Sequence, residues 1–326
     1  MCSQRVFGAS TLSLSPRQAS LVVIGNFDGV HRGHQAVIAQ ALRLAQEQAL
    51  APLVLTFDPH PAVVLGRGAL PALTTLERKL DLLCRQSDEL RVVIEPFTTE
   101  LAQTEPADFA GRLLVEALSA QLVLVGENFR FGRGRAGDFA LLETLGQELG
   151  FHARATALER DAIGPISSTR VRAALERGEL TEVEGLLGRP HAVTGLVVPG
   201  QGRGRSIGVP TANLSELAEA LPPHGVYAVL VDHKRAGAFE ALAAGVANFG
   251  VRPTLGAGPS FEVHLFDTAR DLYGQELRVH LLGRLREERK FSGVDELRAQ
   301  IERDIAVARS LSASRKPDPR ARGAWY

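Results

Sequence analysis

The sequence predicts an α/β plus β protein, in which a Rossmann-like domain with a parallel sheet precedes a small antiparallel β-barrel with a terminal helix. At 326 residues the chain is longer than one typical domain. Its first half alternates short apolar runs with helix-like segments, which is the pattern of βαβ units. Its second half has apolar runs separated by glycine and proline, which is typical of an antiparallel barrel or sandwich.

The apolar runs of the first half are continuous rather than alternating, as expected for strands that are buried on both faces of a sheet. The predicted strands are Leu21–Ile24, Leu53–Phe57, Arg91–Ile94, Leu122–Val125 and Phe151–Ala157. The predicted helices between them are Gln35–Gln48, Leu76–Arg85, Ala107–Leu118 and Phe139–Leu149.

The pattern changes near Leu187–Pro190, where we place the domain boundary. The predicted strands beyond it are His191–Val198, Val226–Val231, Phe261–Phe266 and Leu277–Leu282. An amphipathic helix from about Val294 to Leu311 follows, and Ser292 and Asp295 before it have capping-box spacing. The remaining tail is polar and basic, so we expect it to be disordered. The predicted domains are therefore 1–186 and 187–311, with a tail at 312–326.

Composition indicates an ordinary soluble protein. The chain has 37 basic and 37 acidic side chains, and this balance argues against a dedicated nucleic-acid binder. Cys2 and Cys84 are too few for a disulfide framework, so we expect them to be reduced. The first residues lack a long apolar core, and no apolar run is long enough to span a membrane. We expect a cytoplasmic protein that is a monomer or weak homo-oligomer, with no membrane or nucleic-acid partner.

A glycine-rich turn links the first predicted strand to the first predicted helix. His31 and His34 flank Gly33 in this turn, where free backbone N–H groups and the helix dipole favour an anion. Two imidazoles there can donate hydrogen bonds to phosphate oxygens. Gly25, Gly29 and Gly33 let the backbone approach a ligand. A turn with two solvated histidines is the alternative, and the strand–turn–helix context favours the anion site.

A second glycine-rich segment, Gly200–Leu214, contains basic residues and ends in Pro-Thr-Ala-Asn. Such a loop can surround phosphates with its backbone amides, although it lacks the Gly-Lys-Ser/Thr ending of a Walker A sequence. Thr211 and Asn213 offer two hard oxygen ligands that suit a partly hydrated Mg²⁺. A glycine-rich stretch alone is more often a flexible loop.

These motifs resemble a known family. The His31-Arg32-Gly33-His34 signature is similar to that of the HxGH nucleotidyltransferases, and Gly25–Val30 narrows the resemblance to prokaryotic bifunctional riboflavin kinase/FAD synthetases. The further matching motifs of the first half are Thr56–Pro61, Gly126–Gly132 and Ile166–Arg172. Those of the second half, which resembles the riboflavin kinase domain, are Gly200–Leu214, Gly225–Tyr227, Gly245–Gly250, Arg252–Thr254, Phe261–Leu265 and Asp271–Gly274. The departures are small: Phe249, Phe261 and Phe266 stand where smaller apolar residues are common.

In the first domain the resemblance implies an adenylyltransferase site. His31 and His34 would bind ATP phosphates and stabilise the transition state, while Asp58 and Asn128 would lie at the flavin. The other residues implied to contact ATP or its phosphates are Gly25, Asn26, Phe27, Asp28, Gly29, Gly33, Ser168, Thr169 and Arg172.

In the second domain the resemblance implies a kinase site. Glu262 would act as general base toward the ribityl hydroxyl of riboflavin, and Thr211 and Asn213 would hold Mg²⁺. The loop residues implied to cover ATP are Gly200, Gly202, Arg203, Gly204, Arg205 and Gly208.

The resemblance thus predicts an enzyme with two activities that both use ATP and Mg²⁺. The second domain would phosphorylate riboflavin to FMN, and the first would adenylylate FMN to FAD with release of pyrophosphate. One alternative is an HxGH nucleotidyltransferase for another phosphorylated acceptor, against which the Pro-Thr-Ala-Asn segment argues. The other is a non-catalytic flavin-binding protein, against which the joint presence of His31, His34 and Glu262 argues.

Overall fold

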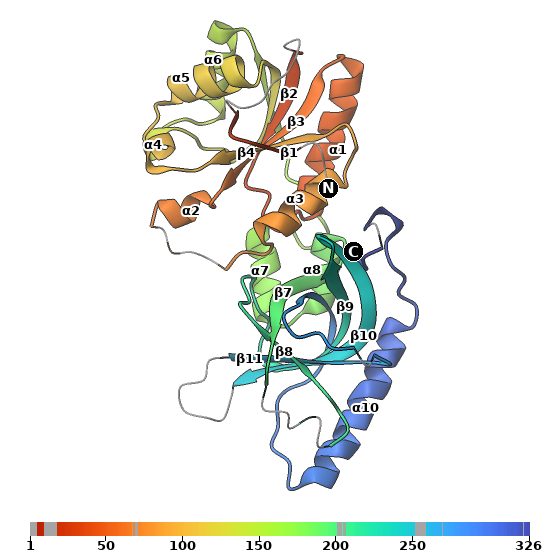
Figure 1. Ribbon diagram of the computed structural model, residues 1–326. Helices are drawn as coiled ribbons and strands as arrows, with labels where there is room; N and C mark the ends of the chain where they lie inside the picture. Colours follow the sequence, from red (N-terminus) through yellow and green to blue (C-terminus); the bar gives the residue numbers. More distant parts are fainter. Residues whose placement is uncertain are drawn as a thin grey trace. The chain divides into compact units, whose positions relative to one another are not determined.

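The chain forms two compact units in the computed structural model (Figure 1). Residues 5–9, 18–66, 68, 71–200, 204, 207–251, 259–268, 270–321 and 323–326 are described. The first unit comprises Met1–Leu70 and Leu76–Ser167, and the second comprises Pro71–Thr75 and Ser168–Tyr326. The division at Ser167 lies before the predicted boundary because two helices, α7 (Ser168–Glu176) and α8 (Leu180–Leu187), pack with the second unit.

The first unit contains a six-stranded sheet with the order β1-β4-β3-β2-β5-β6, in which all neighbouring strands are parallel. The strands are β1 (Arg5–Phe7), β2 (Ser20–Ile24), β3 (Ala51–Asp58), β4 (Arg91–Pro96), β5 (Ala120–Gly126) and β6 (His152–Thr156). The predicted Rossmann-like parallel sheet is confirmed. The strand order reverses at β2. In open α/β sheets, ligands bind beyond the carboxyl ends of the strands at such a reversal.

Helices cover both faces of this sheet (Figure 1). On one face, Leu21 and Val23 pack with α1 (Arg32–Glu47) and α3 (Leu76–Cys84). On the other, Val22 and Ile24 pack with η2 (Phe109–Ala117) and α6 (Phe139–Leu149). The alternation of side chains along β2 explains why its run is continuously apolar.

Four further short helices lie in the described part of the first unit: α2 (Pro61–Val64), α4 (Thr99–Ala102), α5 (Pro106–Asp108) and η3 (Arg133–Arg135). The predicted helix Ala107–Leu118 is present, but its η2 part is π-helical. Cys84 is the last residue of α3, and the expectation that the cysteines are reduced also concerns Cys2, which lies outside the described residues.

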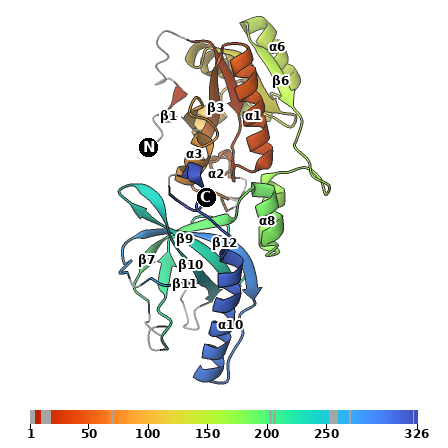
Figure 2. The ribbon, with the colours of Figure 1, turned by 90° about the vertical axis from the view of Figure 1, so that its right-hand side faces the viewer.

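The second unit is built on a closed antiparallel barrel with the strand order β10-β11-β8-β7-β12-β9 (Figure 2). The strands are β7 (His191–Val198), β8 (Ala212–Ser215), β9 (Gly225–Arg235), β10 (Ala238–Val251), β11 (Pro259–Leu265) and β12 (Glu276–Arg286). The predicted barrel is confirmed. Its four predicted runs correspond to β7, β9, β11 and β12, whereas β8 and β10 were not predicted as strands.

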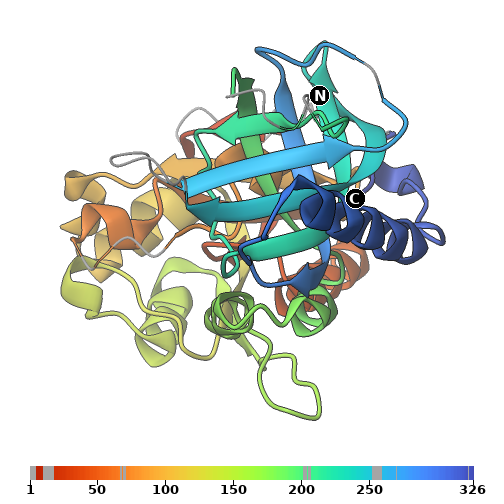
Figure 3. The same ribbon diagram turned by 90° about the horizontal axis from the view of Figure 1, so that it is seen from below.

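The terminal helix α10 (Val294–Ser312) lies along the outside of the barrel (Figure 3). Its Ala308 packs against Ala228, Leu230 and Leu282. The predicted capping pair of Ser292 and Asp295 is wrong, because the N-cap and the acidic third residue of the helix each lie one position further along the chain. Because Gly293 is the N-cap, the third helical residue is Glu296, and its carboxylate accepts hydrogen bonds from the Ser292 N–H (2.9 Å) and hydroxyl (2.8 Å).

The described part of the tail packs against the second unit, contrary to the expectation of disorder. The Trp325 backbone N–H donates to Asp232 Oδ1 (2.9 Å), and its indole N–H donates to the Val231 carbonyl (3.2 Å). Arg315 pairs with Glu184 of α8 (Nη2–Oε2 3.0 Å). These contacts could not be predicted, because the tail is polar and basic except for its last aromatic residues.

The segment Pro71–Thr75 belongs to the second unit although the chain on both sides of it belongs to the first. The Ala220 N–H donates to the Ala72 carbonyl (2.7 Å), and Arg172 Nε donates to the Pro71 carbonyl (3.1 Å). Leu73 is fully buried. The second unit is therefore assembled from two separate pieces of chain.

Candidate active sites

The two histidines of the first motif lie side by side at the start of α1. His31 is the N-cap of this helix, and its Nδ1 accepts a hydrogen bond from the His34 backbone N–H (3.3 Å). The two imidazole rings are stacked with centroids 3.6 Å apart, and the His34 ring lies 5.1 Å from that of Phe27. The helix N-terminus therefore carries both rings at one place, where the helix dipole favours an anion.

Two groups lie close to Gly33 and leave little space for a side chain. A Cβ atom at this position would lie 3.1 Å from the His31 ring and 3.1 Å from the Ile166 carbonyl oxygen. The turn before it is also tight, since Phe27 and Val30 have positive φ angles of 51° and 40°. The backbone thus holds the two histidines in a conformation that most sequences would avoid.

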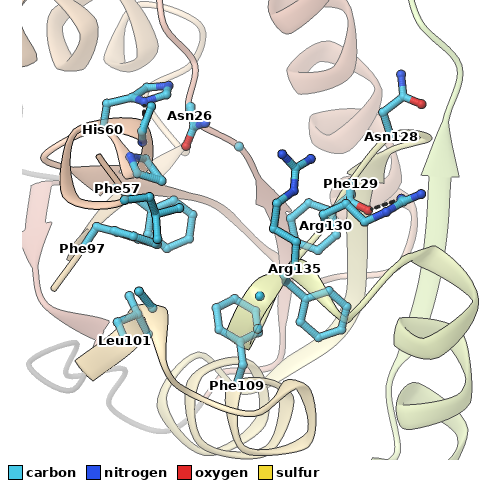
Figure 4. Close-up of a pocket in the computed structure, with 18 residues that line it drawn as sticks. Asn26, Phe57, His60, Phe97, Leu101, Phe109, Asn128, Phe129, Arg130 and Arg135 are labelled. Atoms are coloured by element: carbon cyan, nitrogen blue, oxygen red, sulfur yellow. Dashed lines mark hydrogen bonds between the residues drawn. The ribbon is translucent and has the colours of Figure 1, made fainter. Parts of the chain in front are cut away.

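A cavity of about 360 Å³ lies beyond the carboxyl ends of the parallel strands (Figure 4). It is lined by residues that follow β2, β3, β4 and β5, and several of them are aromatic. The aromatic rings that line it are Phe57, Phe97, Phe109, Phe129 and Phe131. Asn26, His60, Asn128, Arg130 and Arg135 add polar groups at its edge. A flat aromatic ligand with a polar substituent suits such a lining.

The structure brings several of the predicted residues to this cavity. Gly25, Asn26 and Asn128 line it, and Asp58 is the last residue of β3 beside it. Phe27, Asp28 and Gly29 are buried in the turn that leads from Asn26 to His31. Ser168, Thr169 and Arg172 open α7 in the second unit, and the chain before them passes Gly33 at Ile166.

Three residues of the first unit were missed by the sequence analysis. Phe97 follows β4 and Phe109 starts η2, and both line the cavity. Lys79 in α3 donates to the carbonyls of the lining residues Asn26 and Phe57, with only 7 % of its surface exposed. The position of Phe97 at a strand end is the one signal that the sequence offered, since Phe109 and Lys79 stand within helical patterns.

Asn213 and Glu262 of the predicted kinase site lie on two paired strands of the barrel, β8 and β11, and Thr211 immediately precedes β8. The Thr211 hydroxyl donates to Glu262 Oε2 (3.3 Å), and the Ser260 hydroxyl donates to Glu262 Oε1 (3.1 Å). Asn213 of β8 stands opposite Glu262 of β11 in the strand register. This arrangement places a carboxylate, a hydroxyl and an amide at one end of the barrel.

The described part of the glycine-rich loop lies against these residues. A Cβ atom on Gly200 would be 2.2 Å from the Asn213 side-chain nitrogen, and one on Gly204 would be 2.2 Å from the Val209 carbonyl oxygen. Gly208 has a φ angle of 81°, which favours glycine. Gly202, Arg203 and Arg205 lie outside the described residues.

Two further polar residues lie close to this site and were not predicted. Asn248 of β10 stands opposite Glu262 in the strand register, and its side-chain NH₂ donates to Glu288 Oε1 (3.4 Å). Asn248 belongs to a motif that the sequence analysis singled out. Glu288 lies in a run of charged residues, where nothing in the sequence separates it from its neighbours.

Comparisons with known proteins agree with this two-site arrangement. The FAD synthetase family model matches residues 14–170, and the riboflavin kinase family model matches residues 187–312. A crystal structure titled as a macrolide-efflux protein from Streptococcus pneumoniae matches with a TM-score of 0.81 and 29 % identity, covering 94 % of this chain and 99 % of that one. Among the described residues, no helix is long and apolar enough to cross a membrane.

Curated relatives match along nearly their whole length. The bifunctional riboflavin kinase/FMN adenylyltransferase of Escherichia coli K12 is 40 % identical over 312 residues, which cover 95 % of this chain and 98 % of the relative. The protein of the same name from Bacillus subtilis is 36 % identical over 294 residues, which cover 87 % and 90 %. With both family models matched in this order, the chain belongs to the bifunctional riboflavin kinase/FMN adenylyltransferase family.

Proposed function

We propose that this chain makes FAD from riboflavin in two steps at two separate sites. The second unit transfers the γ-phosphoryl group of ATP to the terminal ribityl hydroxyl of riboflavin, which gives FMN and ADP. The first unit then transfers the adenylyl group of a second ATP to the FMN phosphate, which gives FAD and pyrophosphate. The observation that carries the proposal is that one chain holds both a stacked histidine pair, in the turn that continues from the cavity-lining residue Asn26, and a Thr–Asn–Glu cluster in the barrel unit.

The geometry of the first unit supports adenylyl transfer. The flavin ring would lie among the phenylalanines of the cavity, with its ribityl phosphate toward Asn26 and Asn128. The turn that contains Asn26 continues to His31 and His34, whose rings would donate hydrogen bonds to ATP phosphates as charge builds up on them. No covalent intermediate with the protein is needed, because the FMN phosphate is itself the nucleophile.

The geometry of the second unit supports phosphoryl transfer. Glu262 would accept the proton of the ribityl hydroxyl as that oxygen attacks the γ-phosphorus of ATP, and ADP would leave. Its two carboxylate oxygens are already held by the Thr211 and Ser260 hydroxyls. These hydrogen bonds fix the carboxylate at the place where the substrate hydroxyl would arrive.

The residues of the barrel site fit Mg²⁺. Thr211 and Asn213 present hydroxyl and amide oxygens at adjacent positions, the ligand type that this hard cation prefers. We propose that these two side chains hold the ion of the kinase site, with the remaining ligands supplied by water and phosphate. Bound there, Mg²⁺ would neutralise charge on the transferring phosphate.

We further propose that the chain acts in the cytoplasm as a monomer or weak homo-oligomer. The assignment of adenylylation to residues 1–186 and of phosphorylation to residues 187–311 is part of the same proposal. Ser168, Thr169 and Arg172 would then contact ATP phosphates from the start of α7.

The test is chromatography of flavins after incubation of the pure protein with ATP, Mg²⁺ and either riboflavin or FMN. We expect FMN and then FAD from riboflavin, and FAD from FMN. FMN formation without FAD would leave only the kinase. Flavin binding without any ATP consumption would favour a non-catalytic flavin-binding protein. Consumption of ATP only with another phosphorylated acceptor would favour a different HxGH transferase.

A further inference from the structure

Lys79 is a buried lysine whose ammonium group contacts Asn26 and Phe57, two residues that line the cavity of the first unit. It belongs to α3 and lies at the carboxyl ends of β2 and β3, and the residue is only 7 % exposed. A lysine is almost never buried unless polar or charged groups compensate it. The surroundings of this lysine therefore indicate what it does.

Three oxygen atoms surround its Nζ atom. The ammonium group donates to the Asn26 carbonyl (3.4 Å), the Thr56 hydroxyl (3.3 Å) and the Phe57 carbonyl (3.3 Å). The Thr56 hydroxyl also donates to the Asn26 carbonyl (3.3 Å). An ammonium group has three N–H donors, so these three acceptors account for all of them.

These acceptors belong to the two segments that form one edge of the cavity. Asn26 lies in the turn that leads to His31 and His34, and Phe57 immediately precedes Asp58 and the wall formed by His60. Two further hydrogen bonds join the two segments here, from the Gly25 N–H to the Leu55 carbonyl (3.1 Å) and from the Thr56 hydroxyl to the Asn26 carbonyl (3.3 Å). Lys79 adds links from a third element, the helix α3, to both the Asn26 turn and the end of β3.

The charge of Lys79 is balanced by acidic groups on the same two segments. Burial lowers the pKa of its ammonium group, and the charges of Asp58 and Asp28 oppose that shift. The chain otherwise relies on arginine, since no lysine precedes Lys79 and the next one is Lys234. A compact ammonium with three rotatable donors suits three oxygens in different directions, which the planar fork of arginine does not.

We propose that Lys79 is a positioning residue for adenylyl transfer, which holds the Asn26 turn and the Thr56–Asp58 strand end at the spacing that the flavin phosphate and ATP require. It does not touch substrate, because its donors are all used within the protein. The inference rests on the proposed adenylyltransferase activity of the first unit. Reactions that depend on such positioning lose about 100-fold in rate when groups move by about 1 Å.

The decisive variant is Lys79→Met, which keeps the length of the side chain and removes its donors. We expect kcat for FAD formation from FMN to fall about 100-fold and FMN binding, measured by flavin fluorescence, to weaken about tenfold. Riboflavin phosphorylation by the same molecules should stay unchanged. Lys79→Arg should recover only part of the loss. Lys316→Met, at an exposed position of the second unit, is the matched control and should equal the wild type.

A merely structural role gives a different result. It would lower the unfolding midpoint of Lys79→Met, yet the folded protein, assayed well below that midpoint, would keep wild-type kcat and FMN affinity, and this outcome would overturn the proposal. Should Lys79→Met fail to fold, Thr56→Val removes one of the three acceptors, and we expect a fivefold to tenfold loss of kcat, about one tenth of the effect expected above. Wild-type FAD formation in the Thr56→Val variant would also overturn the proposal.

Failure of the proposed function is distinguishable from failure of this inference. If the wild type made FMN but no FAD, the adenylyltransferase assignment would be wrong. FMN binding would then still test Lys79, since weaker binding in Lys79→Met would support its positioning role and equal binding would refute it.

Discussion

In the first unit, the residues around the cavity come from segments that follow four different parallel strands and are far apart in sequence. In the second unit, Asn213, Asn248 and Glu262 lie on three neighbouring antiparallel strands, where the register itself sets their spacing, and Thr211 immediately precedes the first of these strands. A parallel sheet gathers loops at one edge, whereas an antiparallel barrel gathers cross-strand neighbours. The loops of the first unit therefore need side-chain contacts that hold them at a set spacing. In the second unit, the hydrogen bonds between paired strands set that spacing.

This difference decides how each site should respond to substitution. Loss of a single side chain in the barrel leaves the strand pairing intact, so the effect should be confined to chemistry. Loss of a support in the first unit should displace a loop and affect both binding and rate. The following substitutions test that contrast, and each activity serves as the internal control for the other.

The largest effect is expected for Glu262→Gln. Removal of the general base should lower riboflavin phosphorylation by about 1,000-fold or more, because general base catalysis contributes about 10²–10⁴-fold. Glutamine keeps the size of the side chain and can still bond to the Thr211 hydroxyl. FAD formation from supplied FMN should not change. Kinase turnover within twofold of the wild type would show that another group takes the proton.

A second effect is expected for the double variant His31→Ala/His34→Ala. Removal of hydrogen-bond donors that stabilise a charged transition state costs about 10²–10³-fold in kcat. FAD formation should fall by this amount, while FMN formation from riboflavin continues. Assays of both reactions on one preparation would measure the contrast. An equal loss of both activities would contradict the separation of the two sites.

A smaller effect is expected for Gly200→Ala. Its new Cβ atom would overlap the Asn213 side chain, from which it would lie 2.2 Å away, so Asn213 must move. We expect about a tenfold to hundredfold loss in kinase kcat/KM, because a displaced ligand misplaces the phosphate. Gly185→Ala in α8 is the control, since nothing lies within 4 Å of its Cβ position. Equal kinetics for the two variants would mean that the loop adjusts freely.

The smallest effect on activity, but a clear effect on stability, is expected from removal of the residues after Ser312. This truncation removes the Trp325 hydrogen bonds to Asp232 and Val231 and the Arg315–Glu184 pair. A hydrogen bond to a buried charged group contributes about 1.5–3 kcal/mol. Thermal unfolding should show the second unit destabilised and the first unit unchanged. An unaltered unfolding profile would indicate that the tail contacts contribute nothing.

Much of this organisation was predictable from the sequence because its patterns are strong. The continuous apolar runs of β2 to β5 and the glycine-rich turn after β2 identified a parallel sheet with a site at its edge. In contrast, β10 was not predicted, since Ala241–Ala244 and their neighbours have weak strand propensity. Pairing with β9 and β11 on either side gives this segment its conformation.

The residues that escaped prediction act through contacts between distant segments. Lys79 is an ordinary helical lysine until the fold places Asn26 and Phe57 around it. Phe109 lines the cavity because η2 packs on one face of the sheet, which no local pattern shows. The tail was expected to be disordered because its composition is polar, yet the Trp325 backbone N–H donates a hydrogen bond to the carboxylate of Asp232 in the barrel.

The segment Pro71–Thr75 has a consequence for how the chain is made and divided. During synthesis it leaves the ribosome 101 residues ahead of Arg172, with which it shares a hydrogen bond, and further still ahead of Ala220. The second unit therefore cannot be completed until most of the first unit has been synthesised after this early piece. For the same reason, a single cut of the gene between Thr75 and Ser168 yields a barrel fragment without one of its own parts.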